Sequence, residues 1–155
     1  MEFRNPIFVV SALICMHTNN AGAATSNVIF DATVDATCTL QVVSDGTMAV
    51  STNLQNLSSK NAGGSAGSVT LSTTGGVEIG VNPTVVATPP SGDSATTWTP
   101  EYSVSGAHTV ALTSTDTALS TAGTSNVTVH LTGTKSGSDR FTNGAYQAVV
   151  TVTCE

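Results

Sequence analysis

Positive charge is the scarcest feature of this chain: Lys and Arg together number four among 155 residues. A phosphate-binding face needs a cluster of such side chains, so the composition excludes a nucleic-acid-binding role. Charged residues of both signs amount to 9%, which is too few for a coiled coil or a charge-driven disordered tail. Aromatic residues are also few, at 5%. No apolar run approaches the length of about 20 residues that a membrane-spanning helix needs, so we expect no membrane span in the mature chain.

Residues 1–23 have the layout of a secretory signal peptide. A basic residue lies ahead of an apolar stretch from Ile7 to Met16, and Ala21-Gly22-Ala23 forms a small-residue cleavage site. The apolar stretch is too short to span a bilayer, which favours removal over anchoring. We therefore predict a secreted chain that begins at Ala24.

Alternation of apolar and polar residues dominates the remaining chain and predicts strands rather than helices. Apolar residues hold the even positions from Val28 to Leu40, while Thr and Asp hold most of the odd ones. Similar alternation recurs over Trp98–Val104, Val127–Leu131 and Tyr146–Cys154. Tight turns are marked by three dipeptides: Asp45-Gly46, Gly75-Gly76 and Asn143-Gly144. The pattern predicts one all-β domain, an immunoglobulin-like or pilin-like β-sandwich of about 7–9 short strands.

Two cysteines remain after the predicted cleavage. Cys38 lies on the apolar phase of the first long strand, and Cys154 lies on the apolar phase of the last one. Both thiols should therefore point towards the core from terminal strands. Two thiols in a secreted chain usually form one bridge, so we predict a Cys38–Cys154 disulfide.

Patterns that carry catalytic or metal-binding chemistry are weak. Residues Gly63–Gly67 match G-x-S-x-G, but they lie in a Gly/Ser loop ahead of a strand, whereas a nucleophile elbow is followed by a helix. His108 and His130 lack a second ligand at metal-binding spacing. Asp93 and Asp139 occupy Gly/Ser turns and are interpreted as turn residues. We expect no catalytic, cofactor-binding or metal-ligating residue, and hence no enzyme.

Features at the two ends of the chain resemble one family. An alternating segment precedes Cys38 behind the signal peptide, a Gly/Ser/Thr-rich β body follows, and Asn143–Thr153 closes the chain. This layout is similar to that of chaperone–usher fimbrial subunits, in particular spore-coat-U-like and alternate-type pilins. In that family the subunit is an immunoglobulin-like sandwich that lacks one strand, and the N-terminal extension of another subunit fills the gap.

The resemblance implies a role for each end of this chain. Residues 24–36 would form the donor extension, and residues 37–155 the sandwich. The inserting side chains would be Val28, Phe30, Ala32 and Val34. The edge of the acceptor groove would be formed by Tyr146, Ala148, Val150 and Val152. The implied partners are further copies or related subunits, a periplasmic chaperone and an outer-membrane usher, with transport from the periplasm to the surface of a Gram-negative bacterium.

Two functions remain open on the sequence. The first is a structural subunit of a surface fimbria that polymerises by β-strand complementation. The alternative is a self-contained secreted binding module, in which Trp98 and Tyr102 form an aromatic platform for a glycan rather than part of the core. The two hypotheses differ on whether the Val28–Leu40 segment pairs within its own chain or with a neighbour.

Overall fold

The structure is a computed structural model that describes residues 23–155. It divides into residues 23–32, which carry no strand or helix, and a domain over Thr33–Glu155. The predicted signal peptide, residues 1–23, lies outside the described residues except for Ala23. No helix in the described part is long and apolar enough to cross a membrane.

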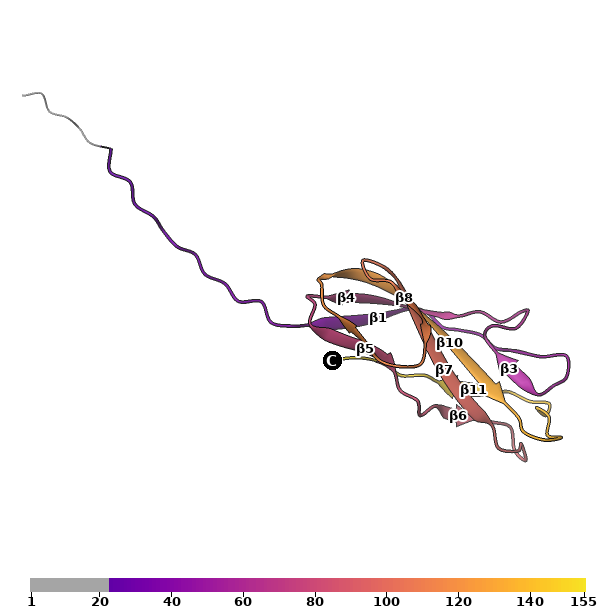
Figure 1. The fold of residues 1–155 in the computed structure, drawn as a ribbon. Helices are drawn as coiled ribbons and strands as arrows, with labels where there is room; N and C mark the ends of the chain where they lie inside the picture. Colours follow the sequence, from indigo (N-terminus) through magenta and orange to yellow (C-terminus); the bar gives the residue numbers. More distant parts are fainter. Residues whose placement is uncertain (1–22) are drawn as a thin grey trace, which may run out of the picture. The chain divides into compact units, whose positions relative to one another are not determined.

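The domain is all-β, as predicted, and its larger sheet is built around one long strand. This sheet contains β1 (Cys38–Ser44), β2 (Ala49–Val50), β3 (Asn56–Ser58), β4 (Gly67–Thr73), β7 (Thr97–Gly106), β8 (Val110–Thr113) and β10 (Gly123–Thr134) (Figure 1). One edge of β10 pairs with β7, and its other edge pairs first with β4 and then with β3. β1 pairs with β4 and stands at the edge of the sheet.

The opposing layer consists of two shorter antiparallel groups. One is a three-stranded sheet in the order β12 (Val152–Cys154), β5 (Val77–Val81) and β9 (Thr117–Leu119); the other pairs β11 (Gln147–Val149) with β6 (Val86–Thr88). Between them, the backbone N–H of Asn82 donates to the carbonyl of Thr151 at 2.8 Å. Residues 146–155 therefore run as one continuous segment along β6 and β5, and we call this segment the C-terminal arm.

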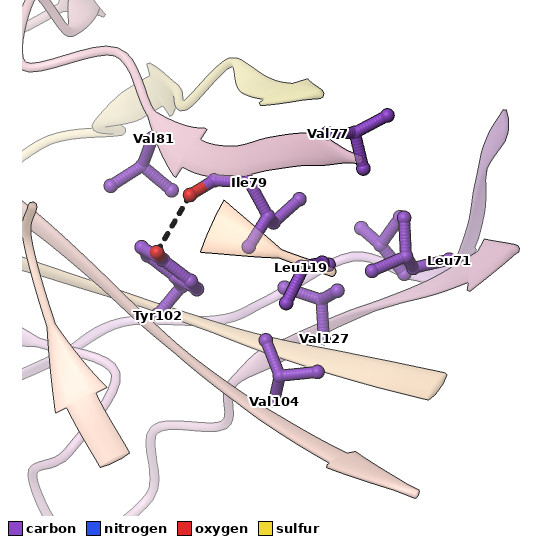
Figure 2. Packing of buried hydrophobic residues seen from close by; sticks show 9 residues of the cluster. Leu71, Val77, Ile79, Val81, Tyr102, Val104, Leu119 and Val127 are labelled. Carbon is purple, nitrogen blue, oxygen red and sulfur yellow. Dashed lines mark hydrogen bonds between the residues drawn. The ribbon is translucent and has the colours of Figure 1, made fainter. Parts of the chain in front are cut away.

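Apolar side chains from the two layers meet in one core. The larger sheet contributes Val69, Leu71, Tyr102, Val104 and Val127, and the opposing layer contributes Val77, Ile79, Val81 and Leu119 (Figure 2). Tyr102 is fully buried, and its hydroxyl lies 2.7 Å from the carbonyl oxygen of Ile79, to which it donates across the sandwich. The alternating burial of β4 and β7 matches the predicted alternation, because successive residues of a strand face opposite sides of the sheet.

The predicted disulfide is present. Cys38 begins β1 and Cys154 ends β12, and their Cα atoms lie 6.1 Å apart across 116 residues of sequence. The bridge therefore joins the edge strand of the larger sheet to the edge strand of the opposing layer, and the C-terminus lies beside the start of β1 (Figure 1).

Three of the predicted turns join strands that do not pair with each other. After Asp45-Gly46 the chain continues into β2, which pairs with β3 rather than β1. Gly75 and Gly76 do adopt positive φ angles of 89° and 74°, but they connect β4 to β5 in the other layer. Asn143-Gly144 leads to β11, which pairs with β6. Turn dipeptides specify local backbone angles, whereas pairing is decided by which layer buries each strand.

The first predicted strand is shorter than its alternation suggested. It begins at Cys38 instead of Val28, and residues 23–37 carry no secondary structure. Phe30 and Val34 are 91% and 77% exposed, so the burial that the alternation predicts does not occur within the single chain. A strand is stable only when its backbone groups have a partner, and alternation by itself supplies none.

Replacing Cys38 and Cys154 together by Ser should lower the free energy of unfolding by about 4–5 kcal/mol, because the bridge restricts a very long loop in the unfolded chain. Urea unfolding followed by Trp98 fluorescence measures this loss. The native chain in reductant serves as the control and should unfold at the same urea concentration as the double variant. A variant as stable as the bridged chain would contradict the prediction.

Candidate functional site

A groove of about 770 Å³ lies along the side of the domain, between β1 and the C-terminal arm. The β1 wall is formed by Leu40, Val42 and Ser44, and the opposite wall by Tyr146, Ala148, Val150 and Val152. Its floor contains Leu57, Val69, Val129 and Leu131. Val42 is 67% exposed, although it is an apolar residue in the middle of a strand. The groove is therefore lined by apolar side chains, with polar ones such as Asp45, Ser59 and His130 among them, and nothing in the described chain covers it.

Both walls of the groove are strand edges. β1 uses one edge to pair with β4, and the C-terminal arm uses one edge to pair with β5 and β6. Within the described domain, no backbone hydrogen bond joins β1 to β11 or β12. Each wall thus presents a row of backbone N–H and C=O groups to the groove, which is the arrangement that accepts an added strand.

The residues predicted as the acceptor edge all lie in one groove wall. Tyr146, Ala148, Val150 and Val152 are half-buried, and the residues between them are exposed, so the arm turns one apolar face to the groove. The sequence did not identify the opposite wall: Leu40 was placed on the first strand but not in a site, and Val42 lies beyond the predicted alternation. The apolar phase of Leu40 was visible, but the position of the arm beside it depends on sheet topology.

The residues predicted as inserting side chains lie in the strand-free segment. Val28 is 73% exposed, and Phe30, Ala32 and Val34 are exposed as well. Their occupation of a groove stays a prediction.

A fully buried ion pair holds the end of the groove wall that is farthest from the disulfide. The ammonium of Lys135 lies 2.5 Å from a carboxylate oxygen of Asp93, and both side chains have no exposed surface. The second carboxylate oxygen of Asp93 accepts a hydrogen bond of 2.8 Å from the Tyr146 hydroxyl. The Lys135 ammonium also lies 4.9 Å from the centre of the Phe141 ring, which packs edge-on against Tyr146. This polar cluster therefore fixes the first residue of the C-terminal arm.

The sequence had assigned Asp93 to a simple turn, and it gave no signal for its pairing with Lys135. Burial alone raises the pKa of Asp93, but hydrogen bonds from Lys135, Tyr146 and Thr142 and the charge of Lys135 outweigh burial and lower the pKa below its ordinary value. The carboxyl is consequently ionised and fully paired at neutral pH.

Ser65 and His130 make hydrogen bonds to neighbouring hydroxyl groups and form no catalytic arrangement with each other. Ser65, the centre of the G-x-S-x-G match, bonds to the Thr47 hydroxyl at 2.8 Å and precedes strand β4, not a helix. His130 lies at the groove, where its Nδ1 is 3.0 Å from the Ser59 hydroxyl oxygen. Burial, and next the charge of Lys60, lowers the pKa of His130. Among residues 23–155, no group of three or more His, Cys, Asp or Glu side chains could hold a metal ion.

Trp98 and Tyr102 do not form one aromatic platform, and for Tyr102 the alternative of a core residue is confirmed. Tyr102 is fully buried in the core. Trp98 instead covers Gly133 on the paired strand, where a Cβ atom would come within 2.6 Å of the indole ring. The two side chains share a phase of β7, but Trp98 lies near the start of the strand and outside the core cluster to which Tyr102 belongs.

A scan against protein-family models, a search of curated proteins and a search of solved structures each found no match to this chain. Its function is therefore inferred from its own residues and their arrangement.

Replacing Lys135 by Met should destabilise the domain by about 3–5 kcal/mol, because the Asp93 carboxylate would remain buried without its partner. The matched control is Lys60→Met, which breaks the partly exposed Lys60–Glu101 pair and should cost less than about 1 kcal/mol. Chemical denaturation of both variants measures the difference. Equal losses in the two variants would contradict the role assigned to the buried pair.

The polar cluster also predicts a pH dependence of stability. The folded-state pKa of Asp93 lies below its ordinary value of 3.8, so its contribution is fully present above that pH and is lost as the pH falls through the folded pKa. The difference in unfolding free energy between the native chain and Asp93→Asn should therefore be constant near neutral pH and shrink as the solution becomes more acidic than about pH 4. A difference that grows on acidification would show that the sign is wrong.

Proposed function

We propose that this protein is a secreted structural subunit that polymerises by β-strand complementation. Residues 28–34 of one copy would fill the groove between β1 and the C-terminal arm of another. One observation carries the proposal: the same chain contains an apolar groove between two unpaired strand edges and, separately, an unpaired alternating segment of matching length.

The lengths and phases of the two parts agree. The half-buried residues of the arm alternate from Tyr146 to Val152, and the extension carries its alternate apolar residues from Val28 to Val34. Both ranges span seven residues, or about 20 Å of extended chain. Asp31, with the other polar residues of the extension, would face outwards, so insertion would bury no charge.

The apolar surface available for burial is substantial. Val28, Phe30 and Val34 are all more than 70% exposed in the single chain. Fully burying one Val or Phe side chain contributes about 1.5–3 kcal/mol. An added strand would also satisfy backbone groups on both walls of the groove, which supports insertion as a stable state.

Insertion of the extension into its own groove is opposed by the contacts at the start of the domain. The carbonyl oxygen of Asp35 accepts a hydrogen bond from the Thr74 hydroxyl, and the backbone of Thr37 pairs with Thr74 in both directions. These bonds extend the β1–β4 ladder past the disulfide, away from the groove. A chain filling its own groove would have to break them and reverse direction within about three residues.

A second copy avoids this reversal. Each copy would donate a strand from one end and accept a strand along its side, so the contact uses two different surfaces and does not close on itself. Such a head-to-tail contact generates a filament, in keeping with the resemblance to fimbrial subunits. We place its assembly in the periplasm and on the surface of a Gram-negative bacterium, an oxidising route that suits the disulfide.

The exposed groove also suggests that the subunit needs a protecting partner before it assembles. Unpaired strand edges associate unspecifically, and apolar grooves promote aggregation. A periplasmic chaperone that covers the groove and an outer-membrane usher that directs the exchange would solve this problem. No observation favours the alternative of a glycan-binding module, because its aromatic platform is not formed.

Changing Phe30 to Asp should abolish polymers, because a carboxylate would have to enter an apolar groove. Thr33→Asp is the matched control, since Thr33 lies on the outward phase of the same segment and its replacement should leave polymers intact. Unboiled samples of the full chain on SDS gels, supported by size-exclusion chromatography, measure the multimer ladder. A native chain that stays monomeric, or a ladder equally sensitive to both changes, would refute the proposal.

Mixing two deficient variants provides a stricter test. Phe30→Asp keeps the groove, and Val150→Asp keeps the extension, so the mixture should give dimers although neither variant polymerises alone. Thr151→Asp, on the exposed phase of the arm, is the control for Val150→Asp and should polymerise normally. Absence of dimers in a mixture of folded variants would contradict head-to-tail exchange.

A further inference from the structure

We infer that the Cys38–Cys154 bridge closes one end of the groove and thereby fixes the register of the inserted strand. In this register Val28 lies next to the bridge and Val34 lies at the far end of the groove. This inference rests on the proposed function. It adds a second role for the disulfide, which is to determine where along the groove the strand binds. A groove could accept a strand without such a role.

The bridge makes one end of the groove too narrow for a strand. Neighbouring strands in a sheet lie about 4.8 Å apart, so a strand inserted between β1 and the arm needs those two strands about 9.6 Å apart. The Cα atoms of Cys38 and Cys154 are 6.1 Å apart and covalently linked. An inserted strand must therefore end before this position.

The first places available to inserted side chains lie two residues from the bridge along each wall, at Leu40 and Val152. From there the walls continue to Val42 and Val150, and then to Ser44 and Ala148. The arm wall ends at Tyr146, which the polar cluster holds in place. The groove thus offers places for four alternate side chains, which is the number in the extension.

The direction of insertion follows from what lies behind each end of the extension. Immediately after Val34, the donating copy is anchored in its own domain through the bonds from Asp35 and Thr37 to Thr74. The bridged end of the acceptor is taken up by its own Asp35 and Thr37, which are bonded to Thr74 just ahead of β1, so the domain of the donor would collide with them there. Val34 must then occupy the far end, beside Tyr146, and Val28 the bridged end.

The register is limited from both sides. Movement by two residues towards the bridge would force the strand into the narrow end and would break the Asp35–Thr74 contact of the donor. Movement by two residues in the opposite direction would expose Val34 and would place the polar Ser26, in place of Val28, opposite Leu40 and Val152. We therefore place Val28 between Leu40 and Val152. Phe30 then lies between Val42 and Val150, and Val34 lies beside Tyr146.

Photo-crosslinking of the full chain tests this assignment. A diazirine amino acid replaces Val28 in one preparation and Val34 in another, and isotopically light and heavy chains are mixed before assembly so that mass spectrometry separates links between chains from links within one chain. We expect light–heavy links from position 28 to Leu40 or Val152, and from position 34 to Tyr146 or Gly46.

The outcomes separate this inference from the proposed function. Light–heavy links with the two ends exchanged, or displaced by two or more residues, would overturn the register and leave strand complementation intact. Absence of light–heavy links in the groove would refute the proposed function and with it the inference.

The double variant Cys38→Ala/Cys154→Ala tests whether the bridge limits the position of the inserted strand. Without the bridge, links from position 28 should spread by two or more residues past Leu40 and Val152, whereas the bridged chain should give one narrow set. An unchanged set in a folded variant would show that the bridge does not limit the register. If the variant does not fold, the crosslinks of the bridged chain alone decide the direction and register of the inserted strand.

Discussion

The covalent bond between Cys38 and Cys154 holds together two strands that share no backbone hydrogen bond. Cys38 begins the edge strand of one layer and Cys154 ends the edge strand of the other, and their Cα atoms lie 6.1 Å apart. A sandwich of small apolar residues has two layers that can separate along their edges. The bridge joins them at one end, and the groove opens where this constraint no longer acts.

The C-terminal arm is positioned by three kinds of interaction along its length. The disulfide holds Cys154, backbone pairing with β5 and β6 holds the middle, and the buried Asp93–Lys135–Tyr146 contacts hold the beginning. The second edge of the arm is consequently kept in place without a strand beside it. A buried ion pair is costly to form, but once it is fully paired it leaves Tyr146 only one favourable position.

The sequence placed the residues of one groove wall on a common face, but it gave no signal for the other parts of the groove. The alternation from Tyr146 to Val152 was sufficient to place those residues on one apolar face. Leu40 and Val42 show the same alternation, but nothing local indicates that they face the arm instead of the core. The pairing of Asp93 with Lys135 joins residues 42 positions apart, and their loops show only turn residues in sequence. Phe30 is exposed in the single chain, because alternation reports amphipathic character and does not supply a pairing partner.

The sequence by itself determined the all-β class, the strands over Trp98–Val104 and Val127–Leu131, and the disulfide, since side-chain period and the phase of each cysteine are local properties. Only the tertiary structure decided which strands pair, that Asp45-Gly46, Gly75-Gly76 and Asn143-Gly144 do not form hairpins, and that β1 and the arm face each other without pairing. Those outcomes depend on contacts between residues far apart in the chain. Such contacts form according to which layer can bury each strand, and no short segment of sequence contains that information.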